Sequence, residues 1–455
     1  LREELAQKIT SDMEASAKRA AARHDDDPVI VVGRVASDQA VDLTLPKTVQ
    51  MALDYNRDIK VAHYALTSSD FDIAIAKAGK MPQVGYTWSG ARKMGQANGR
   101  DVIANSFGNS FSVSIPLYTG GQGENEIANA KLNKTNAQEE MLRVQQATKY
   151  SAVEGYYALL AYQELRDVYH EAVDNLQGHL DNVTAQYNVG TKAKVDVLSS
   201  NVSLANSKTT AVTADNNVAI AESNLNNILG LPLQTKLNLA DHQLPFDTYD
   251  ISLQEAIDYA MKYRPEVLQA AVAVQEAEHN IGIAQAGNRP TVSVGAGRGW
   301  TDDDFPGVDD HNWSITGGVS WSLWDGGATN ARIKKSKEAL LSARETEQKT
   351  REAVQLEVKQ AYLNIRSAAQ KVEETTAVID QAKENYRIQN IRYQAGVGIN
   401  LDVLDAQLSL NEAQVNHIQA LYDYNVGIAK LEQAMGVDVR SGVIHPSLTA
   451  TGYKG

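Results

Sequence analysis

The chain of 455 residues contains no cysteine, which excludes a disulfide framework, a thiolate metal site and a lipid carried on cysteine. Aromatic residues are only 6% of the chain, a composition that favours long helices over a compact enzyme core. No stretch approaches eighteen uninterrupted apolar residues, which excludes a spanning helix. It does not exclude strands that cross a membrane, because their sequence signal is much weaker.

Positive charge is also scarce: the formal net charge is −13. Binding to a phosphate backbone needs clustered Lys and Arg, so we expect no nucleic-acid partner. The nine histidines are scattered, and no zinc-protease motif, Walker loop or nucleophile elbow is present. We therefore expect no catalytic residues, no cofactor and no metal. The acidic stretch 302–310 lacks the spacing of a calcium loop, and a solvated tip is the favoured interpretation.

The apolar content of 43% is high enough for a folded protein, and the sequence is written twice. "LTLPKTVQMALDYNRDIKVA" from Leu43 aligns with "ISLQEAIDYAMKYRPEVLQA" from Ile251. A repeat of roughly 200 residues is too long for a solenoid unit and indicates a duplicated domain. We expect a leader of unknown role at 1–42, a first repeat at 43–248, a second repeat at 251–447 and a tail at 448–455.

Each repeat contains two stretches in which apolar residues alternate with serine, threonine or glycine. Alternation predicts strands, which we place at about 83–91 and 107–118 in the first repeat and 291–300 and 312–324 in the second. An ordinary antiparallel sheet with one buried face is one interpretation. All five tryptophans lie in these hairpins, however, as expected for lipid-facing strands with aromatic residues at the interfaces.

In each repeat we expect short helices before the strands and two long helices after them, at about 122–187 and 195–229 in the first repeat and at about 328–395 and 401–435 in the second. In the helix at 328–395, apolar residues recur at every seventh position from Val358 to Tyr393, which is the pattern of a coiled-coil seam. In the helix at 122–187, the matching row runs from Ala152 to Tyr187. Gly190 and the pair Gly396 and Gly398 are predicted to end the long helices in left-handed geometry, at the tips of two helical hairpins.

Four membrane-crossing strands cannot close a barrel, and open strand edges are not tolerated in lipid. We therefore expect several copies to build one barrel, with the helices forming a coaxial tube. Asp402, Asp405 and Asp196 would then be repeated by symmetry into acidic rings at the far end of that tube.

The duplicated layout, the strand exits "PLYTGG" and "SLWDGG" and above all "YQAGVGINLDVLDA" resemble the outer-membrane efflux (TolC) family. The resemblance covers about 43–447 and, with no cysteine present, is to the non-lipidated type. It implies a mainly helical homotrimer with a twelve-stranded transmembrane β-barrel in outer-membrane lipid and an α-helical tunnel across the periplasm. It also implies a periplasmic adaptor, an inner-membrane pump of RND or ABC type, and a passive role in efflux or type I secretion.

In that family aspartate rings line a periplasmic mouth that links between helices hold shut. The resemblance assigns Asp402 and Asp405 to the rings, Asp196 to the first-repeat aspartate, and Tyr393 to the closing network, with Tyr187 as its counterpart. Closely similar members carry arginine where this chain has Gly398. Lys192, Lys194 or Arg392 could replace that arginine, and the sequence does not choose among them.

Other interpretations of these residues stay open. Asp196 and Asp402 follow helix breaks, where aspartate commonly serves as an N-cap or dipole partner, and Tyr393 could be a packing residue of the seam. For the whole chain, the alternative function is that of a structural coiled-coil protein, either a surface filament subunit or a periplasmic adaptor. An adaptor would need a lipoyl-like domain and a single hairpin, whereas two hairpins and two strand pairs favour the channel.

Overall fold

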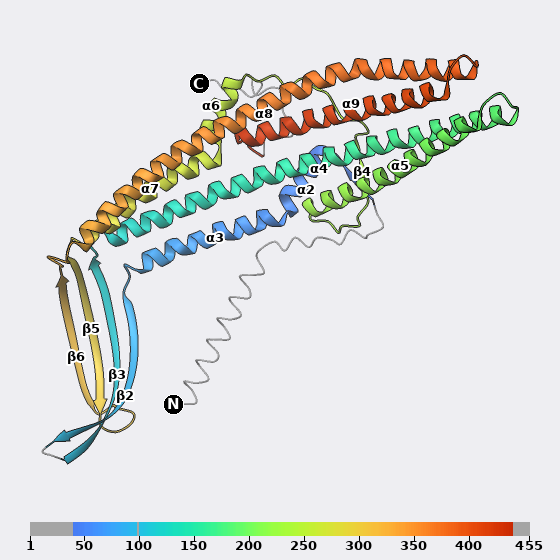
Figure 1. Ribbon diagram of the computed structural model, residues 1–455. Coiled ribbons are helices and arrows are strands. Elements are labelled where there is room, and N and C mark those ends of the chain that lie inside the picture. The colour runs from blue at the N-terminus through green and yellow to red at the C-terminus, as the bar shows by residue number, and fades with distance from the viewer. Residues whose placement is uncertain (1–39, 98–99, 440–455) are drawn as a thin grey trace.

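The computed structural model describes residues 40–97 and 100–439, in which a sheet occupies one end and long helices extend away from it (Figure 1). Most of the leader and the whole tail expected from the sequence lie outside these residues. The first repeat contains α2 (Leu45–Tyr55), α3 (Arg57–Ala78), β2 (Gln83–Ala97), β3 (Arg100–Tyr118), α4 (Gln122–Asn188) and α5 (Lys194–Ile228). The second contains α6 (Leu253–Tyr263), α7 (Pro265–Ala286), β5 (Thr291–Asp302), β6 (Asp310–Ser320), α8 (Ala328–Gln394) and α9 (Asn400–Met435).

The sheet joins the two repeats. Its strand order is β2-β3-β5-β6 and every neighbouring pair is antiparallel. The central pairing of β3 with β5 therefore connects the hairpin of one repeat to the hairpin of the other. Strands β2 and β6 are the edges, and within the described chain neither has a partner on its outer side.

The register of these strands collects the apolar side chains on one face. Tyr86, Phe111, Arg298 and Trp313 form one row across the four strands, and Val84, Val113, Ala296 and Ile315 form the next row on that face. The row between them, on the opposite face, is Gly85, Ser112, Gly297 and Ser314. Trp313, Ile315 and Val319 are all more than 70% exposed, so no described part of the chain covers these apolar side chains.

Three predicted strand boundaries are wrong: the end of β2, the start of β3 and the end of β6. In the first hairpin, pairing continues from Arg92 opposite Asn105 to Ala97 opposite Arg100, through residues expected to be a loop. The missed signal is the Asn-Gly dipeptide at 98–99, typical of two-residue hairpin loops; its own placement lies outside the described residues. In the second hairpin, β6 ends at Ser320 and not near 324, because its partner β5 begins opposite it at Thr291, just after Pro290, which has no N–H to donate.

The helices also form an open row. Near the sheet, α3 packs on α4, α4 on α7 and α7 on α8, which leaves the outer sides of α3 and α8 without a neighbour in the described chain. Farther from the sheet, α4 pairs with α5 and α8 with α9, and α4 packs on α9 (Figure 1). No helix in residues 40–97 and 100–439 has the length and apolar character needed to cross a membrane.

Between sheet and tips, the chain has its largest core. Strands β1 (Val41–Leu43) and β4 (Leu237–Leu239) pair in parallel, and both contribute to this core, through Leu43 and Leu237. Residues of the short helices α2 and α6 complete it. Residues 41 and 42, expected to belong to the leader, thus join the folded body. The α8 seam is buried at Val358, Ile365 and Val372.

The seam predicted for α4 holds only in its first half. Ala152 and Leu159 are fully buried, but toward the tip Tyr187 is 40% exposed. There the buried row runs through Ala172, Leu176, His179 and Val183. It keeps the seven-residue spacing, but 172 and 179 lie one position before the predicted 173 and 180.

Candidate functional site

The tips of the two hairpins, at the end of the molecule farthest from the sheet, have the same backbone geometry (Figure 1). Gly190 follows α4 with φ of 78° and Gly396 follows α8 with φ of 77°. The N–H of the next residue reaches back five positions in each case, Thr191 to Gln186 O at 2.9 Å and Val397 to Arg392 O at 3.0 Å. These bonds form the Schellman motif, which favours glycine at its left-handed position.

Gly398 has a different role from the one predicted. It is not among the glycines with positive φ. A Cβ at this position would instead lie 3.0 Å from the Tyr393 nitrogen and 3.1 Å from the Arg392 carbonyl carbon. The turn is packed so closely on the end of α8 that this position favours glycine, and no side chain from it can link the helices.

The three aspartates lie at the beginnings of the returning helices. Asp196 is the third residue of α5 and Asp402 the third residue of α9, and both are half-buried. The N-cap positions are Ala193 and Ile399, and neither helix start has a side-chain cap. The capping alternative is therefore wrong, whereas a favourable interaction with the helix dipole fits the first-turn positions. Asp405 lies one turn farther along α9 and is exposed.

Tyr393 is fully buried in a small core at the tips, with Val183 of α4 and Val403 of α9. The packing interpretation of this residue therefore holds for the ring. Its hydroxyl, however, has no hydrogen-bond partner among the described residues. Burial raises the pKa of the Tyr393 phenol, and the carboxylate of Asp196 raises it further, so the phenol is neutral at physiological pH.

Of the cations considered for the tip network, Lys192 is the one placed on Tyr393, with its Nζ 4.3 Å from the ring centroid, a cation–π contact. Arg392 is exposed and donates to Gln389 Oε1 at 3.3 Å. Lys194 is exposed in the first turn of α5. Tyr187 is outside the tip core.

A buried polar cluster, missed in the sequence, lies beside Tyr393. His179 Nε2 is 2.6 Å from Asn400 Oδ1, and Ser200 Oγ donates to the same oxygen at 3.1 Å. The His179 ring centroid is 5.1 Å from that of Tyr393. Burial lowers the pKa of His179, while the bond to Asn400 and the charge of Asp196 oppose this shift. The sequence gives one signal for this cluster, a histidine on the buried face of α4. It could not be recognised, because the predicted row passes through Leu180 and not through His179.

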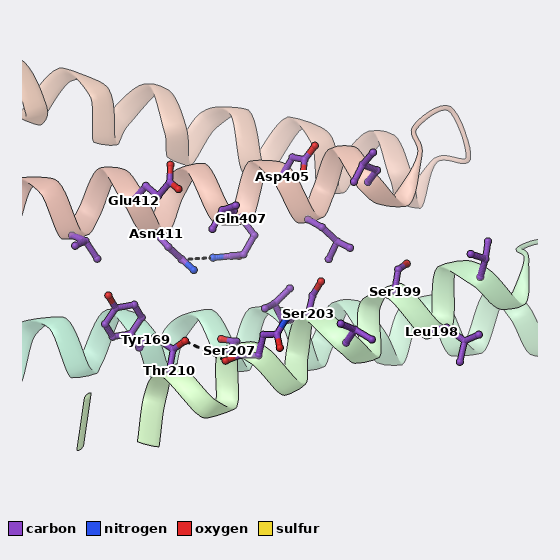
Figure 2. A pocket seen from close by; sticks show the side chains of 18 of the residues that line it. Tyr169, Leu198, Ser199, Ser203, Ser207, Thr210, Asp405, Gln407, Asn411 and Glu412 are labelled. Carbon is purple, nitrogen blue, oxygen red and sulfur yellow. Dashed lines mark hydrogen bonds between the residues drawn. The ribbon is translucent and has the colours of Figure 1, made fainter. Parts of the chain in front are cut away.

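A groove of about 1020 Å³ runs from the tips along the hairpins, between α5 and α9 and over α4 (Figure 2). Leu198 and Ser203 of α5 face Asp405 and Gln407 of α9 across it, with Tyr169 of α4 at its inner end. Asp405 is the one predicted ring aspartate that lines the groove; Asp196 and Asp402 are not among its lining residues.

Comparison with known proteins agrees with this architecture. Residues 48–231 and 256–437 match the outer membrane efflux protein family, so both repeats are matched separately. The outer membrane efflux protein BepC of Brucella suis is 25% identical over 90% of this chain and 89% of its own length. The outer membrane protein TolC of Escherichia coli is 24% identical over 81% of this chain and 78% of its own.

A solved structure, that of the outer-membrane channel OprN, superimposes with a TM-score of 0.76 at 19% identity, covering 86% of this chain and 89% of OprN. The predicted fold class, with two repeats that each give a strand hairpin and long helices, is confirmed. The chain belongs to the outer membrane efflux protein family.

Proposed function

We propose that three copies of this chain form a passive exit channel that passes through the outer membrane and extends into the periplasm. The observation that carries the proposal is the sheet, which has an exposed apolar face and two edge strands that are unpaired within the described residues. An apolar face suits lipid, but unpaired backbone N–H and C=O groups at an edge do not. Pairing of β2 in one copy with β6 in the next removes the edges and closes the sheet.

The helices support the same assembly. The outer side of α3 carries a stripe of exposed apolar side chains, formed by Val61, Tyr64, Phe71 and Ile75. In its sheet-proximal half, α8 exposes Leu341. Packing of α3 on α8 of the next copy would cover both surfaces. Four strands from each of three copies give a twelve-stranded barrel, within the range known for outer-membrane barrels, with the helices forming a tube beneath it. A filament subunit or an adaptor has no use for an exposed apolar sheet.

At the far end of the tube, Asp402, Asp405 and Asp196 form acidic rings in this assembly, and Tyr393 with Lys192 belongs to the packed tip beside them. Rings of carboxylates select cations and bind multivalent ones most strongly. The partners are a periplasmic adaptor and an inner-membrane pump, as in the tripartite systems of the family. The exposed leucines and serines of the α5–α9 groove offer a helical partner a surface at this end.

The experiment is single-channel recording in planar bilayers with protein purified from membranes. The parent protein should conduct, and a trivalent cation such as hexaamminecobalt should block it from the side of the helix tips. Asp402→Ala with Asp405→Ala should weaken this block by about tenfold or more, since two of the charges in each copy are lost. Glu384→Ala with Asp423→Ala, which removes two exposed carboxylates away from the tips, is the matched control and should leave the block unchanged. Equal block in both variants would place the aspartates outside the conduction path.

A further inference from the structure

The buried cluster at the tips connects the two helical hairpins through one side chain. Asn400 is the first residue of α9, and its Nδ2 donates to Ser199 Oγ at 2.9 Å and to the Asp196 carbonyl oxygen at 3.3 Å. Its Oδ1 accepts from Ser200 at 3.1 Å and contacts His179 Nε2 at 2.6 Å. All these partners belong to α4 or α5, whereas Asn400 belongs to the other hairpin.

These contacts determine the hydrogen positions on His179. The Asp196 carbonyl can only accept, so the Asn400 amide must point its nitrogen toward Asp196 and its oxygen toward His179. His179 Nε2 is therefore the protonated nitrogen and donates to Asn400. Nδ1 is then an unprotonated acceptor, and it is buried without a hydrogen-bond partner among the described residues. The ring is 4% exposed, so the site holds a neutral imidazole.

Among the described residues, no other hydrogen bond joins the two hairpins at the tips. The Lys192–Tyr393 contact and the core of Val183, Tyr393 and Val403 also span both hairpins, but without a hydrogen bond. Gly398 offers no side chain, Arg392 bonds within α8, and the buried hydroxyl of Tyr393 has no hydrogen-bond partner in the described chain. The Asn400 cluster is also one turn or less from both aspartates of the helix starts, Asp196 and Asp402. Separating the two hairpins at this point would move the aspartates of one hairpin away from those of the other.

We propose that the bond from His179 to Asn400 is the link that holds the two hairpin tips of each copy together, and that proton uptake by His179 releases it. This inference rests on the proposed channel function, in which the tips form the periplasmic mouth. His179 and Asn400 act as positioning residues: they set the distance between the hairpins, and through it the width of the mouth.

The direction of the pH effect follows from the surroundings of His179. A proton on Nδ1 would create a buried donor and a charge with no acceptor, which the closed tip disfavours. Of the groups on the packed elements, the carboxylate of Asp196 on α5 favours the charge. Lys192, which lies on the Tyr393 ring, opposes it, and α8 presents the neutral phenol of Tyr393. Burial is the largest influence, and it lowers the pKa of His179 in the closed tip.

With the histidine pKa lowered in the closed tip and near 6.5 when the tips separate, the open state binds more protons. The link is therefore at full strength above about pH 6.5 and weakens as the pH falls below it. One histidine changes the ratio of open to closed tips by at most about tenfold per pH unit per copy.

The test measures tip separation and conductance in the same variants of the full-length assembled protein. Because the chain has no cysteine, spin labels on Val189→Cys and Val397→Cys report the distance between the exposed tips in assemblies with one labelled copy. We expect the labels to separate, and the open probability to rise by up to about tenfold per copy, between pH 7.5 and 5.5. Asn400→Ala should be separated and open at both pH values.

His179→Gln separates the hydrogen bond from the proton. Glutamine can still donate to Asn400 Oδ1 but cannot be charged, so this variant should stay closed at both pH values. His417→Gln is the matched control: His417 bonds to Thr375 at 3.0 Å within the second hairpin and should retain the parent pH response. Unchanged pH dependence in His179→Gln, or unchanged label distances in Asn400→Ala, would overturn the proposal. If the label distances change as expected but neither the parent protein nor any variant conducts, the His179–Asn400 link is supported and the proposed channel function is wrong.

Discussion

Ile315→Lys is expected to prevent the protein from assembling in the outer membrane, whereas Thr316→Lys should be tolerated. Ile315 is at the centre of β6, on the apolar face, and its neighbour Thr316 points to the small polar face. A lysine facing lipid near the middle of the bilayer costs about 2–4 kcal/mol, and an assembly of three copies carries this cost three times. A lysine facing the wet interior costs far less.

The measurement is the amount of assembled protein in outer-membrane fractions, together with the urea midpoint for unfolding from lipid vesicles. The two variants add the same charge at adjacent positions of the same strand, so each controls for the other. Equal loss of assembly in both variants would mean that neither face is in lipid. A greater loss in Thr316→Lys would assign the faces the other way round.

Phe71→Glu with Ile75→Glu is expected to convert the assembled protein into single chains. The two side chains are 65% and 69% exposed and belong to the α3 stripe, which begins at Val61 and Tyr64. Burying a side chain of this size contributes about 1.5–3 kcal/mol, so losing both, and placing charges there, should weaken each contact between copies by more than about 3 kcal/mol. The effect is repeated at every contact in a closed ring.

Light scattering of the detergent-extracted protein gives its mass, expected to be about three times the 49.5 kDa of one chain for the parent. His63→Glu with Lys77→Glu is the matched control, because both residues are exposed on α3 and neither lies three or four positions from a stripe residue. This control should keep the parent mass. Loss of assembly in the control alone, or in neither variant, would contradict the packing of α3 against another copy.

The features that the sequence predicts well are those with a regular period or a repeat. The alternation from Trp313 to Val319 identifies a strand, and the seven-residue spacing from Val358 identifies a seam, because side-chain direction follows directly from backbone geometry. Because the sequence is duplicated, an element predicted in one repeat can be compared with its counterpart in the other repeat. The long helices therefore begin and end within one residue of their expected positions.

Sequence reasoning failed where the outcome depends on contacts between distant segments. The end of β6 is decided by where its partner β5 begins, and the function of Gly398 by its approach to Arg392. The tip cluster is the clearest case, since His179 and Asn400 are 221 residues apart and neither belongs to a motif. A single buried polar pair of this kind has no period, so it can be recognised only when the helices are placed together.

In the proposed channel, neighbouring copies close the edges of the sheet around a water-filled bore. An experimental structure of the membrane-extracted protein tests this arrangement most directly. We expect three copies in which β2 of each is hydrogen-bonded to β6 of the next and the helices surround an open axis. Edge strands capped within a single copy, or helices packed solid along the axis, would contradict it.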